Sequence, residues 1–126
     1  MPQYMLLIYA PADTPPSADR LPRWQRYTDS LVEAGVMVTN GRLQDTTTAT
    51  SLLIRNGEPI VSDGPFAETK EYLGGFYLLE CPDLDAALAH AARMPLDDYG
   101  TVEVRPMMFP AGTPAGAMRP AADVRT

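Results

Sequence analysis

The sequence predicts an α+β fold in which two helices cover one face of a mainly antiparallel sheet. Two segments with helical periodicity are each flanked by short segments of strand character, and a strong hairpin signal separates these two units. The element order is therefore β-α-β, hairpin, β-α-β, which is that of a ferredoxin-like βαββαβ sandwich with an inserted β-hairpin. At 126 residues the chain fits one domain with its own core.

The first unit places an amphipathic helix between two strands. Residues 4–9 form a continuous apolar run of strand length, which is typical of a central strand buried on both faces. Residues 17–34 repeat apolar side chains at helical spacing and end before Gly35, so we expect a helix there. Pro22 belongs in the first turn of a helix, which moves the start a few residues beyond 17. Residues 36–39 complete the unit as a short strand.

The inserted hairpin has the clearest local signal in the chain. Two apolar segments, 52–55 and 58–61, are joined by Asn56-Gly57, the dipeptide most typical of a two-residue hairpin turn. Pro59 cannot donate a backbone hydrogen bond, so the second strand is expected at an edge.

The second unit repeats the pattern of the first. Residues 75–80 are predicted as a strand, 83–94 as a helix capped by Asp83, and 101–108 as the last strand. Residues 1–109 would form a single domain. The remaining segment, 110–126, is rich in Ala, Pro and Gly without periodicity, and is expected to be a loose tail or to settle on a partner subunit.

Side chains alternate along the last strand and predict two different sheet faces. Val102 and Val104 point to one face, and Glu103 and Arg105 to the other. Both helices must cover the apolar face. The open face therefore meets either water or a second subunit with a polar cleft, and we expect a ligand pocket there.

Composition excludes several classes of function. The net charge of −6 and the scattered basic residues argue against a nucleic-acid partner. One cysteine, Cys81, excludes an internal disulfide, and one histidine, His90, is too few for a typical metal site. The N-terminal apolar run is too short for a signal peptide or a membrane span. We expect a cytoplasmic protein without metal, cofactor or membrane partner.

The segment 63–71, Asp-Gly-Pro-Phe-Ala-Glu-Thr-Lys-Glu, is the main candidate for a functional site, because charged side chains are concentrated there between two strands. Asp63 is either a turn-forming residue or a carboxylate that faces the cleft. Phe66 is expected to anchor the loop to the core. The other charges, Glu68, Lys70 and Glu71, form either a solvated run or part of a ligand site. Trp24 and Tyr27, at helical spacing, are assigned to the core.

The segments Tyr-Met-Leu-Leu-Ile-Tyr at 4–9, the block at 63–71, Leu-Gly-Gly-Phe-Tyr at 73–77, Asp-Leu-Asp-Ala-Ala at 83–87 and Val-Glu-Val-Arg-Pro at 102–106 resemble the DGPF-type branch of the YCII-related family. The resemblance implies a ferredoxin-like subunit that pairs into a dimeric α+β barrel with the open faces together. It implies no settled reaction, although members are often encoded beside extracytoplasmic-function sigma factors. A His-Asp pair proposed for other members does not carry over, because His90 is in the second helix.

Two functional hypotheses follow, and the sequence leaves open whether the protein is an enzyme. In the first, a homodimer binds a small polar or anionic metabolite in the open-face cleft. This hypothesis includes the option that the same site carries out cofactor-free acid–base catalysis. The residues assigned to this site are the acid–base candidates Asp63 and Glu68 and the ligand-binding candidates Lys70, Glu71, Glu103 and Arg105. In the second, the protein is a non-catalytic regulatory or interaction module linked to sigma-factor systems.

Overall fold

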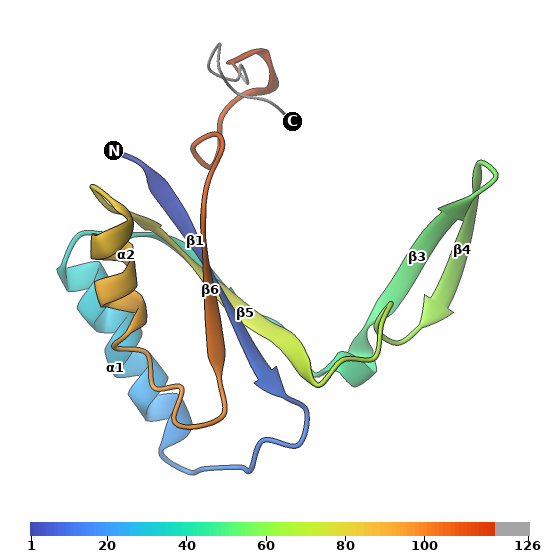
Figure 1. Cartoon of the computed structure of the whole chain (residues 1–126), viewed down its shortest axis with the longest axis horizontal. Coiled ribbons are helices and arrows are strands. Elements are labelled where there is room, and N and C mark those ends of the chain that lie inside the picture. The colour runs from blue at the N-terminus through green and yellow to red at the C-terminus, as the bar shows by residue number, and fades with distance from the viewer. Residues whose placement is uncertain (118–126) are drawn as a thin grey trace.

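The computed structural model describes residues 1–117, which form a four-stranded antiparallel sheet, two α-helices on one face of it and a separate two-stranded hairpin (Figure 1). In chain order the elements are β1 (Gln3–Pro11), α1 (Arg20–Glu33), β2 (Met37–Arg42), a 3-10 turn (Thr46–Thr48), β3 (Thr50–Arg55), β4 (Glu58–Asp63), β5 (Glu71–Glu80), α2 (Leu84–Ala91), β6 (Thr101–Pro106) and a second 3-10 turn (Ala115–Ala117). The predicted α+β fold class is confirmed. Of the predicted tail, residues 118–126 lie outside the described residues.

The strand order of the main sheet is β2-β5-β1-β6, with antiparallel neighbours throughout, as in a ferredoxin-like fold. The apolar first strand is central, as predicted. β5 begins at Glu71 and not at residue 75, so the predicted start was wrong. Gly75 pairs with Ile8 and Leu73 pairs with Tyr9, so Gly74 is an extra residue that forms a bulge. Pairing with β1 continues on the other side of this bulge as far as Glu71. The glycine pair therefore marks a β-bulge inside a strand and not its end.

The hairpin turn and the cap of α2 follow local rules. Asn56 and Gly57 both have positive φ, 52° and 76°, as a tight hairpin turn requires. The Asp83 side chain accepts a hydrogen bond from the backbone N–H of Ala86 at 2.8 Å and caps α2. The helices α1 and α2 begin and end within a few residues of the predicted bounds, and Pro22 lies in the first turn of α1.

The core lies between the two helices and the sheet. Alternate residues of the central strands face the helices, and the buried residues of the cluster are Tyr4, Leu6, Tyr27, Leu31, Tyr77, Leu79, Cys81, Ala87, Ala91 and Met94. On the opposite face Leu78 is buried, and β1 and β5 also present the partly buried Met5, Leu7 and Phe76. Neither helix of the described residues has the length and apolar character needed to cross a membrane.

A polar contact joins the two helices above this core. The hydroxyl of Tyr27 donates to the backbone carbonyl of His90 at 2.7 Å, and the Arg93 guanidinium lies 5.4 Å from the Tyr27 ring centroid. Arg93 Nη2 lies 3.0 Å from His90 Nδ1. An arginine only donates, so Nδ1 accepts and the imidazole is neutral. Burial, and next the Arg93 charge, lower the pKa of His90.

The lowered pKa predicts a pH-dependent stability. The folded state holds neutral His90, whereas the unfolded chain binds a proton near pH 6.5. The contribution of neutral His90 to the free energy of unfolding is complete above pH 6.5, and it is lost as the pH falls toward the folded pKa. His90→Gln should flatten this part of the curve, measured as the urea midpoint against pH. The two proteins losing equal stability just below pH 6.5 would contradict the assignment.

Candidate functional site

A cavity of about 550 Å³ opens between the N-terminal half of α1 and the end of the sheet where β5 begins. This volume is within the usual range of small-molecule sites. The lining comes from α1, from the facing ends of three strands and from the segment that joins α2 to β6. The lining residues used below are Arg20, Trp24, Thr28, Asp29, Asn40, Arg42, Gly74, Gly75, Tyr77, Leu96 and Tyr99.

Gly75 explains why the helix-covered face is hollow at this point. It precedes Tyr77 by two residues, so a side chain at position 75 would point to the same face of the sheet. A Cβ built there would lie only 2.6 Å from the Gly41 carbonyl oxygen in β2. The close approach of the β2 backbone therefore requires glycine, and the glycine leaves the space beneath α1 without a side chain.

Aromatic rings form one wall of the cavity. Trp24 and Tyr77 are stacked with their ring centroids 6.2 Å apart and an interplanar angle of 15°. Tyr27 supports both rings edge-on, at 5.9 Å from Trp24 and 5.4 Å from Tyr77. The wall is thus held by ring–ring contacts on its core side, and Trp24 and Tyr77 present surface to the cavity.

The hydroxyl groups beside this wall have a defined direction of donation. Thr28 Oγ1 donates a hydrogen bond to the Trp24 carbonyl oxygen at 2.9 Å. The Tyr77 hydroxyl lies 2.6 Å from Thr28 Oγ1. Thr28 has a single hydroxyl proton, so Tyr77 is the donor in the second bond. Burial raises the pKa of Tyr77, which keeps that proton in place. The Tyr77 oxygen is then left with acceptor capacity only, and a ligand that meets it must donate.

Charged side chains lie among the lining residues nearer to solvent. Arg20, Arg42 and Asp29 line the cavity, so two positive charges and one negative charge give a local balance of +1. Arg42 and Asp29 are exposed, and Arg20 is partly buried. The local balance favours a ligand with a negative group near its exposed end.

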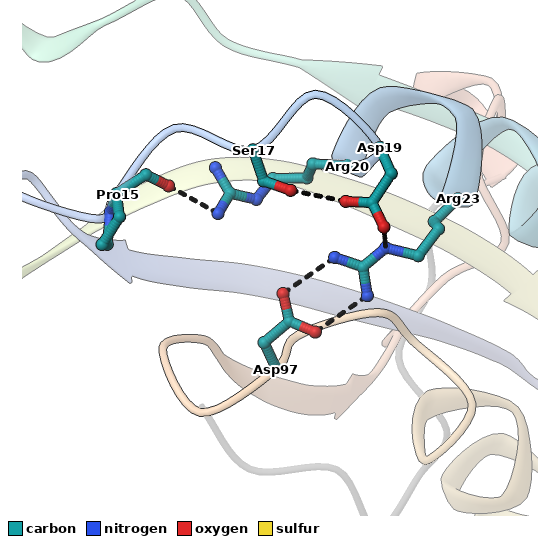
Figure 2. Close-up of polar contacts among 6 residues, drawn as sticks. All are labelled: Pro15, Ser17, Asp19, Arg20, Arg23 and Asp97. Atoms are coloured by element: carbon teal, nitrogen blue, oxygen red, sulfur yellow. Dashed lines mark hydrogen bonds and ion pairs between the residues drawn. The ribbon is translucent and has the colours of Figure 1, made fainter.

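Two loops beside the cavity are fastened to the first turn of α1, as Figure 2 shows. Arg23 donates from Nη1 and Nη2 to the two carboxylate oxygens of Asp97, both at 2.8 Å. Arg20 Nη2 donates to the Pro15 carbonyl at 2.6 Å. Asp19 approaches Arg23 Nε at 3.6 Å and accepts from Ser17. The segment before α1 and the segment after α2 are therefore both tied to one helix end.

Asp97 has an uncommon backbone conformation, and its side chain is held by Arg23. Its φ of 55° is in the left-handed region, which non-glycine residues occupy at a cost. The bidentate hydrogen bond from Arg23 holds the residue there and lowers the pKa of its carboxyl group. We refer to the Arg23–Asp97 pair as the clamp. The lining residues Leu96 and Tyr99 are close to Asp97 in the chain, so the clamp positions that side of the cavity.

The structure brings together three of the six predicted site residues. Lys70, Glu71 and Glu103 line a shallow, open concavity on the open sheet face, together with Tyr9, Thr69 and Thr101. Glu71 Oε1 accepts a hydrogen bond from the Thr101 hydroxyl at 3.0 Å. Arg105 lies further along β6, opposite Met5, and does not line the concavity.

The two acid–base candidates lie elsewhere. Asp63 ends β4 at the base of the hairpin, opposite Thr50, and is exposed; Glu68 is exposed in the following loop. None of the six predicted residues lines the cavity beneath α1. The expectation that Phe66 anchors the loop was wrong, because its side chain is 94% exposed.

The cavity was not predicted from the sequence, because its main residues have the spacing of ordinary core residues. Trp24 was assigned to the core, and it does support core rings, but another part of its surface faces the cavity. The available signal was the pair Gly74-Gly75 two residues before Tyr77, which removes side chains from the middle of a bulky strand. Among residues 1–117, His, Cys, Asp and Glu side chains nowhere gather in threes as metal ligands would.

Asp97→Asn tests the clamp. Because the pKa of Asp97 is lowered in the folded state, its ionised carboxylate stabilises the fold at pH values above the ordinary pKa of 3.8. This stabilisation is lost as the pH falls through the folded pKa. The variant should therefore be less stable than the parent at neutral pH, and the difference should shrink in acid, as followed by urea denaturation. Asp98→Asn, at the neighbouring exposed aspartate, is the control. A difference that does not change with pH would contradict the clamp.

Comparison with known proteins agrees with the family resemblance of the sequence. The model of the YCII-related domain matches residues 1–109. Over 78 residues the chain is 50% identical to an uncharacterized protein of Rhizobium meliloti (strain 1021), and the alignment covers 60% of this chain and 63% of that protein. The chain thus aligns with less than two thirds of this relative's length. Since the family model covers most of the sequence, the chain belongs to the YCII-related family.

Proposed function

We propose that the protein binds a small planar molecule in the cavity beneath α1. The observation that carries the proposal is the combination of an aromatic wall, Trp24 and Tyr77, with a buried hydroxyl oxygen that has acceptor capacity only. A glycine floor at Gly74 and Gly75 allows close approach to the sheet backbone. Sites of this kind combine apolar surface with a few polar groups that fix orientation.

The lining defines the class of ligand. A flat, unsaturated ring suits the Trp24 face, and an N–H or O–H group on that ring suits the Tyr77 oxygen. A carboxylate or other anionic group suits Arg20 and Arg42 near the exposed end. The proposed ligand is therefore a small aromatic or heteroaromatic acid that carries a hydrogen-bond donor.

A homodimer in which each copy covers the open sheet face of the other is part of the same proposal. Met5, Leu7 and Phe76 leave apolar surface on a sheet face that neither helix covers, and a second copy is the simplest cover for it. Lys70, Glu71 and Glu103 would then lie at the margin of the dimer interface. Any proton transfer there would fall to Asp63 or Glu68, with Arg105 as an anion contact.

The second candidate function is a non-catalytic regulatory module of the kind that serves sigma-factor systems. The exposure of Asp63, Glu68 and Lys70 favours it, because a docking loop presents its charges to solvent. A module of this kind needs no ligand in the α1 cavity, which separates it from the first proposal.

The single tryptophan provides a direct test. Trp24 lines the cavity and is the only tryptophan in the chain, so its fluorescence reports occupancy without a label. Titration with a panel of small aromatic acids should give saturable quenching for members that carry a donor. Tyr77→Phe, which removes the acceptor oxygen, should weaken these ligands by about fivefold to tenfold.

Two controls complete the titration. Tyr72→Phe removes a hydroxyl outside the cavity lining and should leave affinity unchanged. Lys70→Ala alters the open-face concavity and should also leave it unchanged. Binding that is lost in Lys70→Ala and kept in Tyr77→Phe would move the site to the open face. A panel without saturable binding would favour the regulatory module.

A further inference from the structure

The β3–β4 hairpin, residues 50–63, carries a concentration of exposed apolar side chains. Figure 1 shows it standing apart from the main sheet, on the side away from the helices. We refer to this hairpin as the arm. The exposed fractions of its large apolar residues are 61% for Leu52, 48% for Leu53, 59% for Ile54, 49% for Ile60 and 63% for Val61.

These side chains occupy both faces of the arm. Leu52 is paired with Val61 and, on the other face, Leu53 with Ile60. Within residues 1–117, β3 and β4 form ladder hydrogen bonds only with each other. An isolated two-stranded hairpin is marginal in water, and it needs packing on another surface to be stable. We therefore expect the apolar side chains of the arm to pack against another surface.

The exposed apolar area of the arm can be compared with the area that an interface needs. Phe66, just beyond the base of the arm, adds an almost fully exposed ring. Of the two faces of the arm, the one with Leu52, Ile54 and Val61 exposes roughly 300 Å² of apolar surface, from typical side-chain areas. A standard interface buries about 800 Å² per partner, whereas the largest apolar patch of a typical monomer is about 300–600 Å². One face of the arm thus supplies somewhat less than half of the area that each partner contributes to a standard interface.

We infer that the arm packs on the open sheet face of a second copy of this chain. That face offers the matching surface, because Met5, Leu7 and Phe76 leave apolar surface there and Glu103 and Arg105 lie beside them. The tip of the arm carries Arg55 opposite Glu58, so both surfaces combine an apolar centre with one charge of each sign.

Twofold symmetry makes the contact reciprocal. Each copy has one arm and one open face, so two copies related by a twofold axis can each place an arm on the other. Each copy then buries one face of its own arm and a similar area of its open sheet face, roughly 600 Å² in all, which is the low end of the range for a stable interface. The inference rests on the proposed pairing of two copies, and adds to it that the arm and not the sheet alone holds them together.

The first experiment measures association after the arm loses apolar surface. The arm variant is Leu52→Ser/Ile54→Ser/Val61→Ser, on one face of the hairpin. The matched control is Val32→Ser/Leu84→Ser/Leu88→Ser, which removes three exposed apolar side chains from the helices. Sedimentation velocity over a wide range of concentration gives the dimer dissociation constant. We expect the arm variant to weaken the dimer at least about a hundredfold and the control to leave it unchanged.

The second experiment locates the contact by disulfide trapping. Cys81 is the only cysteine and is fully buried, so a cysteine introduced on the surface reacts alone. A mixture of Ile54→Cys and Leu7→Cys proteins should form a disulfide-linked heterodimer on oxidation. A mixture of Ile54→Cys with Val32→Cys, on the outer surface of α1, should not.

The outcomes separate this inference from the proposed pairing. Equal dimerisation of parent and arm variant overturns the role of the arm and leaves pairing through the open faces in place. A parent that stays monomeric overturns both. Rapid crosslinking of Ile54→Cys with itself, without a product from the mixture, overturns the open face as the contact and places arm against arm. Circular dichroism of the arm variant checks that the helices and main sheet remain folded.

Discussion

The packing of α1 against the central strands is the contact on which the rest of the structure depends. Tyr27 and Leu31 bury one side of the helix against Tyr77 and Leu79 of β5, and the same helix continues past the core to cover the space above Gly75. The helix therefore closes the core at one end and roofs a cavity at the other. A change that moves α1 alters both, because close packing transmits displacement through such a contact.

The two ends of this contact are held by different forces. At the core end, apolar burial and the Tyr27 hydroxyl join α1 to α2. At the cavity end, where Gly75 leaves no side chain to pack on, Arg23 and Asp97 hold the neighbouring loop by a bidentate ion pair. Polar contacts of this kind fix geometry more than they add stability, because the pair is partly exposed to water.

Two apolar surfaces of the chain have no cover among the described residues: the open sheet face and the arm. A sheet with helices on one side leaves its other side to a partner or to water, and a hairpin with apolar residues on both faces has the same need. Both surfaces combine apolar side chains with charges of each sign, which connects the proposed pairing of copies with the proposed role of the arm.

Sequence alone determined the order of the elements, the hairpin turn at Asn56-Gly57, the cap at Asp83 and the two-faced character of β6, because these depend on neighbours within a few residues. Only the tertiary structure decided where the cavity lies and that Phe66 is exposed. Trp24 of α1 meets Gly75 and Tyr77 of β5 at the cavity, and in its own segment each of these residues has a pattern that is common in helices or strands. The bulge at Gly74, and with it the start of β5 at Glu71, also depends on pairing with β1. Such features follow from long-range packing, which no local pattern specifies.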